Sequence, residues 1–249
     1  MSPLHALAIF AAGLAAGTIN TVVGSGSLIT FPTLVALGYA PVLANVSNNI
    51  GLVPGSLSGV YGYRRELRGQ RHRITALGPA SLAGGLTGAL LLLVLPGSVF
   101  AHVVPVLILI ALALVITGPR LAARVAARRG GDAATIGVAL TACVYATGIY
   151  GGYFGAAQGI ILIALLTIFL QDDLQRLNAT KNVLAMFVNG IASVVFILGT
   201  NVDWKVVGII AGGSIIGGQV GATVGRRLAP PALRAIIVLV GLVAVVRLL

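Results

Sequence analysis

Long apolar runs fill almost the whole of this chain and leave few residues for a water-soluble surface. Hydrophobic residues make up 58% of the 249 residues, and charged residues only 8%. The mean hydropathy of +1.05 agrees with this shortage of polar surface. Such a composition predicts an all-α polytopic membrane protein. We distinguish ten apolar segments, at residues 4–23, 27–38, 42–63, 74–95, 99–118, 134–153, 158–170, 175–199, 205–225 and 232–249.

A polar, glycine-rich break interrupts the first apolar run at Gly24, Ser25, Gly26 and Ser27. The segment that follows is too short to cross a bilayer, because a helix of about 10 residues covers only ~15 Å of the ~30 Å hydrocarbon layer. Non-helical backbone at this depth is tolerated only where it lines a polar cavity or is packed within protein. The pattern therefore predicts a half-membrane helix that begins at Gly26 and Ser27.

The break recurs later in the chain, which indicates an internal repeat. Gly17 and Gly24 correspond to Gly148 and Gly155 at an offset of 131, and the second break reads Gly155-Ala156-Ala157-Gln158-Gly159. At an offset of 133 the matched positions are Asn45, Ser47, Asn49 and Ser56 with Asn178, Thr180, Asn182 and Asn189, and Gly84, Gly85 and Gly88 with Gly217, Gly218 and Gly221. We expect two five-segment repeats, 1–118 and 133–249, with a connector at 119–132.

The basic residues predict how the repeats are oriented. The net charge is +11, and the arginines gather in short loops, at Arg64, Arg65, Arg68, Arg71 and Arg73, at Arg120, Arg124, Arg128 and Arg129, and at Arg226, Arg227 and Arg234. Such loops stay in the cytoplasm. The first two segments of each repeat return the chain to its starting side, so each repeat makes an odd number of crossings. The two repeats are therefore predicted to be inverted, with both termini outside and the broken helices at the midplane.

The two breaks are the first candidate site. Helices that begin at Gly26–Ser27 and Ala157–Gln158 would direct free N–H groups and positive dipole ends at the same place, which favours an anion. Gly24, Gly155 and Ala156 would supply backbone, while Ser25, Ser27 and Gln158 would add side-chain donors. The alternative is that the small residues only allow close helix crossing.

A stripe of polar side chains is the second candidate. Asn178, Asn182 and Asn189 are spaced so that they share one helical face, and Asn45, Asn49 and Ser56 repeat the pattern. We expect Asn45, Asn49, Asn178 and Asn182 to line the substrate cavity. Interhelical hydrogen bonding is the alternative role.

Lys181 is the third candidate, because it is the only cation close to the polar stripe. A charge beside a membrane cavity is a functional candidate. The alternative is that Lys181 snorkels to the cytoplasmic interface beside Asp172, Asp173 and Arg176.

Several functional classes find no support in the sequence. Glu66, Asp132, Asp172, Asp173 and Asp203 fall in loops, so we expect no cation site and no proton relay. No metal cluster or catalytic nucleophile is apparent, and we expect neither an enzyme, nor a cofactor, nor a nucleic-acid partner. The single cysteine, Cys143, excludes an intramolecular disulfide. Residues 1–5 lack a basic region, so no cleaved signal peptide is expected. Whether the protein forms a homodimer stays open.

The first break and its surroundings resemble a known family. The run Gly17-Thr18-Ile19-Asn20-Thr21-Val22-Val23-Gly24-Ser25-Gly26-Ser27 with its continuation to Pro32, the run Ala44-Asn45-Val46-Ser47-Asn48, and the second copy after Gly148 resemble the TauE/SafE family of sulfite and organosulfonate exporters. The resemblance covers nearly the whole chain and implies a bacterial inner-membrane permease for small sulfur-containing anions. Serines replace some of the usual glycines in the first break, which leaves the particular substrate open. Uptake of another small organic anion and a non-transporting membrane subunit are the alternatives.

Overall fold

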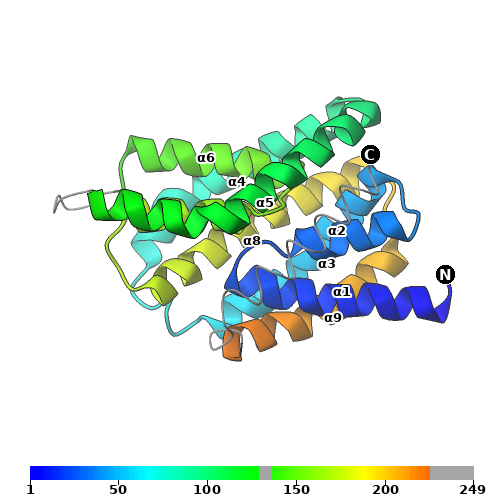
Figure 1. The fold of residues 1–249 in the computed structure, drawn as a ribbon, viewed down its shortest axis with the longest axis horizontal. Coiled ribbons are helices and arrows are strands. Elements are labelled where there is room, and N and C mark those ends of the chain that lie inside the picture. Colours follow the sequence, from blue (N-terminus) through cyan, green and yellow to red (C-terminus); the bar gives the residue numbers. More distant parts are fainter. Residues whose placement is uncertain (129–135, 225–249) are drawn as a thin grey trace.

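The computed structural model describes residues 1–128 and 136–224, and this part of the chain is helical, without a strand (Figure 1). Apart from the C-terminal part of α5, the helix bounds lie within a few residues of those of the predicted apolar segments. The tenth predicted segment, 232–249, lies outside the described residues. The helices are α1 (Pro3–Val22), α2 (Ser27–Ala36), α3 (Pro41–Gly62), α4 (Arg71–Val94), α5 (Gly97–Arg128), α6 (Val138–Tyr153), α7 (Gln158–Phe169), α8 (Leu174–Gly199) and α9 (Trp204–Thr223).

Helix α5 continues about ten residues beyond its predicted apolar segment. The sequence predicts that the connector between the repeats begins at residue 119, but the helix runs on to Arg128. Residues 121–128 consist mainly of alanine, arginine and leucine, which have high helix propensity. The connector therefore starts as a helical extension, and its residues 129–132 lie outside the described part.

Polar side chains at helix starts explain several of the boundaries. The Ser2 hydroxyl accepts a hydrogen bond from the His5 N–H at the start of α1 (3.2 Å). The Asp173 carboxylate accepts from the Gln175 N–H at the start of α8 (2.8 Å). Asp203 caps α9 in the same way, through the N–H groups of Lys205 and Val206. These caps satisfy donors that a helix leaves free, and the two carboxylates also complement the helix dipoles.

Close pairs of helices bring the two halves of the chain together. Helix α1 lies along α9, and α4 lies along α6 (Figure 1). A Cβ atom on Gly17 would lie 2.4 Å from the Ser214 carbonyl oxygen, and one on Gly88 would lie 2.0 Å from that of Ile149. Glycines at these crossings therefore permit close helix packing.

Helices α3 and α8 pack antiparallel at the centre of the molecule. The Tyr63 hydroxyl, just after α3, donates to Gln175 Oε1 near the start of α8 (3.2 Å). The Ser193 hydroxyl, late in α8, donates to Asn49 Oδ1, early in α3 (2.8 Å). Helix α3 also packs on α9, and α8 on α4, so this pair joins the two outer pairs.

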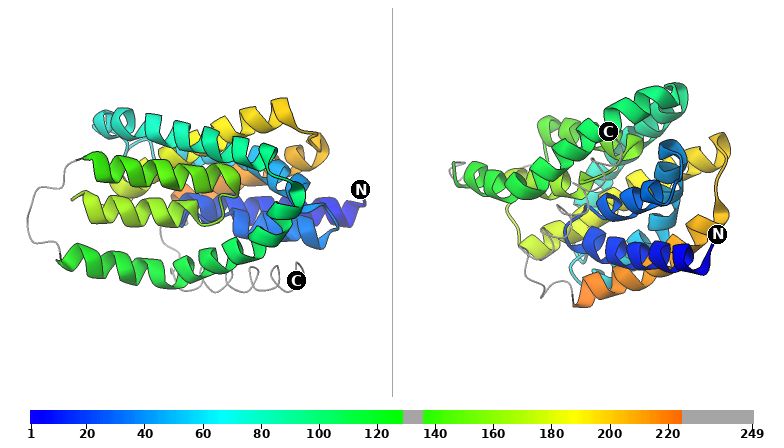
Figure 2. Two further views of the ribbon diagram at one scale, coloured as in Figure 1. Left: turned by 90° about the horizontal axis from the view of Figure 1, so that it is seen from above. Right: turned by 45° about the vertical axis from the view of Figure 1, so that its right-hand side comes forward.

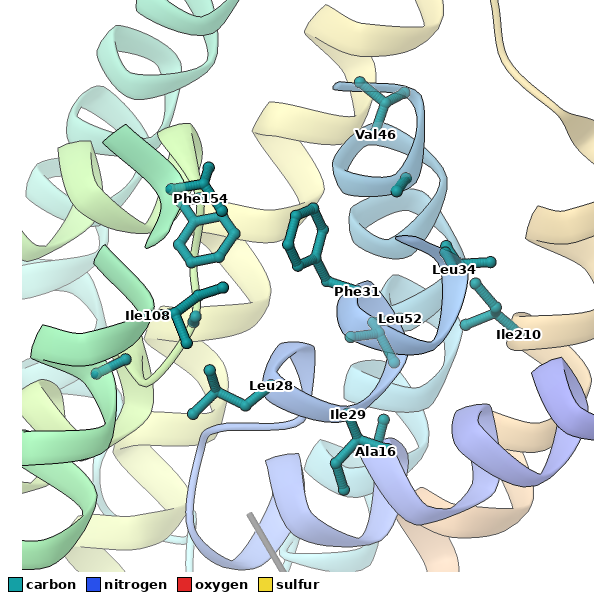
Figure 3. Close-up of a cluster of buried hydrophobic side chains, with 14 of the residues drawn as sticks. Ala16, Leu28, Ile29, Phe31, Leu34, Val46, Leu52, Ile108, Phe154 and Ile210 are labelled. Atoms are coloured by element: carbon teal, nitrogen blue, oxygen red, sulfur yellow. The ribbon is translucent and has the colours of Figure 1, made fainter. Parts of the chain in front are cut away.

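An apolar cluster holds the short helix α2 against α5 and the end of α6. The ring of Phe31 makes edge contacts with the rings of Phe154 and Phe100, with centroids 5.2 Å and 6.4 Å apart. Figure 3 shows Phe31 facing Phe154, with Leu28 and Ile108 beside them. Figure 2 (left) shows α5 along one side of the molecule, next to α7, on which it packs. These contacts hold α2 in place beside the break.

Charged and polar residues at one end of the molecule form a network. It joins the start of α4 and the residue before it to the α7–α8 loop and the start of α8. Asp172 Oδ2 lies 2.5 Å from the Arg73 guanidinium and 3.0 Å from that of Arg176. Gln70 Nε2 donates to the Arg176 carbonyl oxygen, and its Oε1 accepts from the Thr180 hydroxyl (2.8 and 2.7 Å). This clasp, defined as residues 70, 73, 172, 176 and 180, connects the two predicted repeats at that end.

The described helices suit a membrane protein. Five of them are long and apolar enough to cross a bilayer, namely α1, α4, the apolar part of α5, α8 and α9. Large apolar side chains also cover outward surfaces, for example Val94 and Leu198, which are 79% and 83% exposed. The short helices α2 and α7 are apolar but have only 10 and 12 residues. They are too short to span a bilayer, as the sequence predicts.

Candidate functional site

The first break joins α1 to α2 through a tight turn. The N–H groups of Val23 and Gly24 both donate to the Ile19 carbonyl oxygen, at 2.7 and 3.0 Å. Gly24 has a φ of 87°, a left-handed conformation that glycine adopts without the steric cost of a Cβ. Helix α2 then begins at Ser27 with Gly26 as its N-cap. The predicted start of the short helix is confirmed.

The second break has the same hydrogen-bond pattern. The N–H groups of Phe154 and Gly155 both donate to the Tyr150 carbonyl oxygen, at 3.0 and 3.1 Å. Gly155 has a φ of 76°, and Ala157, the N-cap of α7, has a φ of 65°. Tyr150, Phe154 and Gly155 lie 131 residues after their counterparts in the first break, the offset that the sequence repeat predicts. The predicted start of α7 at Gln158 is also confirmed.

The two breaks are in direct contact. The Gly159 N–H, in the first turn of α7, donates to the Gly24 carbonyl oxygen at 3.0 Å. A Cβ atom added to either glycine would lie 2.4 Å from the Cα of the other, so no side chain fits between them. The start of α7 and the turn before α2 therefore meet, although 135 residues separate them in the sequence.

Two polar side chains at this contact are buried without a partner. The Ser25 hydroxyl and Gln158 Nε2 have no hydrogen-bond partner within the described residues, and these side chains are only 1% and 3% exposed. Each is next in sequence to one of the touching glycines. Because a buried unpaired polar group is costly, such groups indicate a ligand, a water molecule or a conformational change.

The helix starts add dipole ends to the same place, but not the free N–H groups that the sequence predicts. The N–H groups of Leu28 and Ile29 donate to the carbonyl oxygens of Ser25 and Gly26, and those of Gln158, Gly159 and Ile160 donate to those of Gly155, Gly24 and Ala157. Neither α2 nor α7 has a side chain that caps its first N–H groups. The positive ends of both helix dipoles therefore lie at the contact between the breaks. The acidic side chains described, Glu66, Asp172, Asp173 and Asp203, all lie in turns or at helix starts, and none belongs to either break. This arrangement is suited to a negatively charged group.

The asparagine stripe lies beside the breaks, and most of its hydrogen bonds hold helix ends. Asn45 Nδ2 of α3 donates to the Tyr153 carbonyl oxygen at the end of α6 (3.0 Å). Reciprocally, Asn178 Nδ2 of α8 donates to the Thr21 carbonyl oxygen at the end of α1 (3.2 Å), and Asn182 Nδ2 does the same (3.2 Å). Asn49 accepts from Ser193. These contacts support the interhelical role that the sequence left open.

Lys181 lies deep in the protein rather than at its surface. Its side chain is fully buried, and Nζ donates to the carbonyl oxygens of Asn20 and Thr21, at 3.2 and 3.4 Å. The alternative that Lys181 snorkels to the interface is therefore wrong. The carboxylate of Asp172 is engaged by Arg73 and Arg176 instead.

Two residues that sequence reasoning did not place in the site hold the breaks in shape. Asn48 Nδ2 donates to the Ser27 hydroxyl at the start of α2 (3.1 Å), and its Oδ1 accepts from Thr30. The Tyr150 hydroxyl donates to the Ala156 carbonyl oxygen in the second break. The signal for Asn48 was present, because this residue is the counterpart of Lys181 at the offset of 133.

Comparison with known proteins identifies the family. Residues 9–248 match the family described as sulfite exporter TauE/SafE. This match covers nearly the whole chain. This chain belongs to the TauE/SafE family. The resemblance predicted from the first break is confirmed.

Relatives of this TauE/SafE member are named as membrane transporters. A protein of Escherichia coli (strain K12), "Probable membrane transporter protein YfcA", is 28% identical over 100% of this chain and 91% of its own length. A "Probable membrane transporter protein" of Haemophilus influenzae is 27% identical over 90% of this chain and 88% of its own. "Probable membrane transporter protein ORF9" of a Sinorhizobium species is 28% identical over 98% and 93%. No solved structure matches the chain. Family and names indicate a membrane-embedded transporter.

Proposed function

We propose that this chain transports small sulfur-containing oxyanions, such as sulfite or organosulfonates, and that it exports them. The family description supports the choice of sulfite. The observation that carries the proposal is the contact between the two breaks, where Gly159 N–H meets the Gly24 carbonyl beside the unpaired Ser25 hydroxyl and Gln158 amide. Gly24, Ser25, Gly26 and Ser27 and residues Gly155, Ala156, Ala157 and Gln158 would form the two walls of the site.

The donors at this contact favour an anion over a cation. Two unpaired side chains offer O–H and N–H groups beside the positive ends of two helix dipoles. A cation would instead need carboxylates within the membrane, and the described carboxylates lie in turns or at helix starts. We also propose that Asn45, Asn49, Asn178 and Asn182 exchange some of their present bonds for substrate as the site opens.

Two inverted repeats would give this site alternating access. The hydrogen-bond pattern repeated at the two breaks supports the repeat. The antiparallel contact of α3 with its counterpart α8 supports the inversion. The packing also agrees with a two-fold relation between the repeats. Helix α1 packs on α9, and their counterparts in the other repeat, α6 and α4, pack on each other.

The membrane potential would drive export without a coupled ion. Moving one negative charge out of a cytoplasm-negative cell is favourable by ~2.3 kcal/mol per 100 mV. We propose that the protein lies in the bacterial inner membrane with its arginine-rich loops in the cytoplasm. Arg73 and Arg176 belong to the same clasp. This agrees with placing the α3–α4 loop and the α7–α8 loop on one side of the membrane.

Transport by the purified full-length chain in liposomes tests the proposal. The panel would comprise sulfite, sulfate, thiosulfate, sulfoacetate and small carboxylates, with protein-free liposomes as the control. We expect sulfite to be taken up, faster with an inside-positive potential and faster again when the same unlabelled anion is trapped inside. A strict requirement for a proton gradient at constant potential would contradict the mechanism.

Three other functions would give different results in the same liposomes. A permease for another small organic anion would favour a carboxylate of the panel over the sulfur oxyanions. A membrane subunit that needs a partner would be folded but inactive alone. A channel would pass current without acceleration by trapped anion.

A further inference from the structure

Within the described residues, no acidic side chain forms an ion pair with Lys181. The ion pairs found within residues 1–128 and 136–224 join Asp172 to Arg73 and to Arg176, and Lys181 takes part in neither. The side chain is nevertheless fully buried. An unpaired ammonium in a protein interior is strongly disfavoured, so its position needs a compensating partner.

The carbonyl groups around Lys181 accept only some of the side-chain N–H groups that lie near them. Lys181 Nζ, Asn178 Nδ2 and Asn182 Nδ2 all donate to the Thr21 carbonyl oxygen, and Nζ also donates to that of Asn20. An ammonium has three N–H groups and each carboxamide has two. The nitrogens therefore offer more N–H groups than these two oxygens accept.

This surplus lies at the edge of the first break. Asn20 contacts the N-cap of α2, since a Cβ on Gly26 would lie 2.9 Å from the Asn20 Cβ. The break that begins there contains Ser25, whose hydroxyl is buried and unpaired. The side chains with spare N–H groups therefore contact Asn20 and Thr21, only a few residues before the start of α2.

The helix ends leave Lys181 as the net charge of this region. At each break the negative C-terminal end of one helix meets the positive N-terminal end of the next, α1 with α2 and α6 with α7. Summed over the whole region, these partial charges of about half a unit each largely cancel, so the positive ends of α2 and α7 favour an anion only locally. The second repeat contributes Lys181, whereas the first has the neutral Asn48 at the matching position.

We propose that Lys181 is the counter-charge of the transported anion and that its single positive charge selects monoanions, such as a sulfonate or hydrogensulfite, over dianions. This inference rests on the proposed function. A second negative charge would stay uncompensated at low dielectric, whereas a neutral isostere would leave the ammonium unpaired. Both should therefore bind more weakly than a monoanion.

Competition in wild-type proteoliposomes tests the charge preference without a substitution. Uptake of radiolabelled ethanesulfonate would be measured against methanesulfonate, 1,2-ethanedisulfonate and the neutral ethanesulfonamide. We expect methanesulfonate to compete at least ~10-fold better than the other two, the loss that one charged hydrogen bond implies. Equal competition by the dianion or by the neutral compound would overturn the proposal.

Substitutions then assign the preference to Lys181. K181M should raise the KM for ethanesulfonate roughly 10- to 100-fold, while K181R should stay within a few-fold of the wild type. The exposed Lys205 gives a matched control, and K205M should leave KM unchanged. A folded K181M protein with wild-type KM would overturn the assignment. If K181M does not fold, loss of the monoanion preference in K181R overturns it and retention supports it.

These outcomes separate this inference from the proposed function. If the wild-type protein takes up no anion at all, both fail. If it takes up ethanesulfonate but without a preference for monoanions, the proposed function stands and the role of Lys181 fails.

Discussion

At the scale of single residues, Gly24 has two independent reasons to be glycine. Its φ of 87° is unfavourable for other residues, and a Cβ would lie 2.4 Å from the Gly159 Cα. Gly38 shares only the first reason, because its φ is 92° but nothing lies within 4 Å of its Cβ position. Comparing Gly24 with Gly38 therefore separates the effect of backbone conformation from the effect of the contact between the breaks.

We predict that Gly24→Ala abolishes most transport while Gly38→Ala does not. Both substitutions incur about 1 kcal/mol of left-handed strain, and Gly24→Ala adds overpacking of about 1–3 kcal/mol. Transport in proteoliposomes and thermal unfolding in detergent would be measured for both variants. Equal transport by the two variants would show that contact between the breaks is not required.

The candidate site was only partly predictable at this scale. Gly24, Ser25 and Gln158 stood out in the sequence because a polar break in an apolar run has few structural explanations. The burial of Lys181 did not stand out, because the sequence shows that the residue lies near a helix start but not what packs over it. Its partners are main-chain carbonyls of α1, about 160 residues away, and carbonyls carry no sequence signal.

At the scale of helices, the repeated glycine motifs make corresponding contacts in the two halves. Gly88 of α4 lies against α6, and its counterpart Gly221 of α9 lies against α1. The repeat offset predicted that these motifs are equivalent, but not that each contacts the other half of the chain. Partner choice depends on how helices cross in space, which a glycine pattern alone does not encode.

We predict that Gly88→Ala destabilises the protein and that Gly190→Ala does not. The new methyl group on residue 88 would lie 2.0 Å from the Ile149 carbonyl oxygen, whereas nothing lies within 4 Å of the Cβ position of Gly190. Overpacking should lower the free energy of unfolding by about 1–3 kcal/mol, and alanine in an open helical position should raise it by up to ~1 kcal/mol. Thermal unfolding of both variants measures this. An unchanged melting temperature for Gly88→Ala would contradict the close α4–α6 contact.

The clasp gives a pH-dependent prediction for the two loops that it joins. Partial burial alone would raise the pKa of Asp172, but hydrogen bonds from Arg176, Arg73 and the Asp173 N–H outweigh it and hold this pKa below its usual value. Because the folded-state pKa is lower than the unfolded one, the clasp stabilises the protein at neutral pH. This stabilisation is lost as the pH falls from about 4 through the folded-state pKa.

Asp172→Asn should therefore lower the melting temperature at pH 7 by a few degrees, about 1 kcal/mol for a partly exposed ion pair. The difference from the wild type should shrink as the pH falls below about 4. Asp173→Asn is the matched control, since asparagine keeps the helix cap and Asp173 makes no ion pair in the described residues. A difference between wild type and Asp172→Asn that stays constant down to pH 3 would rule out the ion pairs as its cause.

At the scale of the whole molecule, the two halves interlock instead of forming separate bodies. Helix α1 packs on α9, α6 packs on α4, and α3 crosses α8 between these pairs. Each half also caps a broken helix of the other, through Asn45 on the end of α6 and Asn178 on the end of α1. Movement of one half against the other would change both breaks together, which is what alternating access at one site requires.

The most direct test is to locate the anion in a structure of the full-length protein. Crystals grown with selenite, the selenium isostere of sulfite, would reveal its position through the anomalous signal of selenium. We predict selenium at the contact between Gly24 and Gly159, within hydrogen-bonding reach of the Ser25 hydroxyl and Gln158 Nε2. Selenium bound elsewhere in the membrane-spanning part, with Ser25 and Gln158 still unpaired, would contradict it.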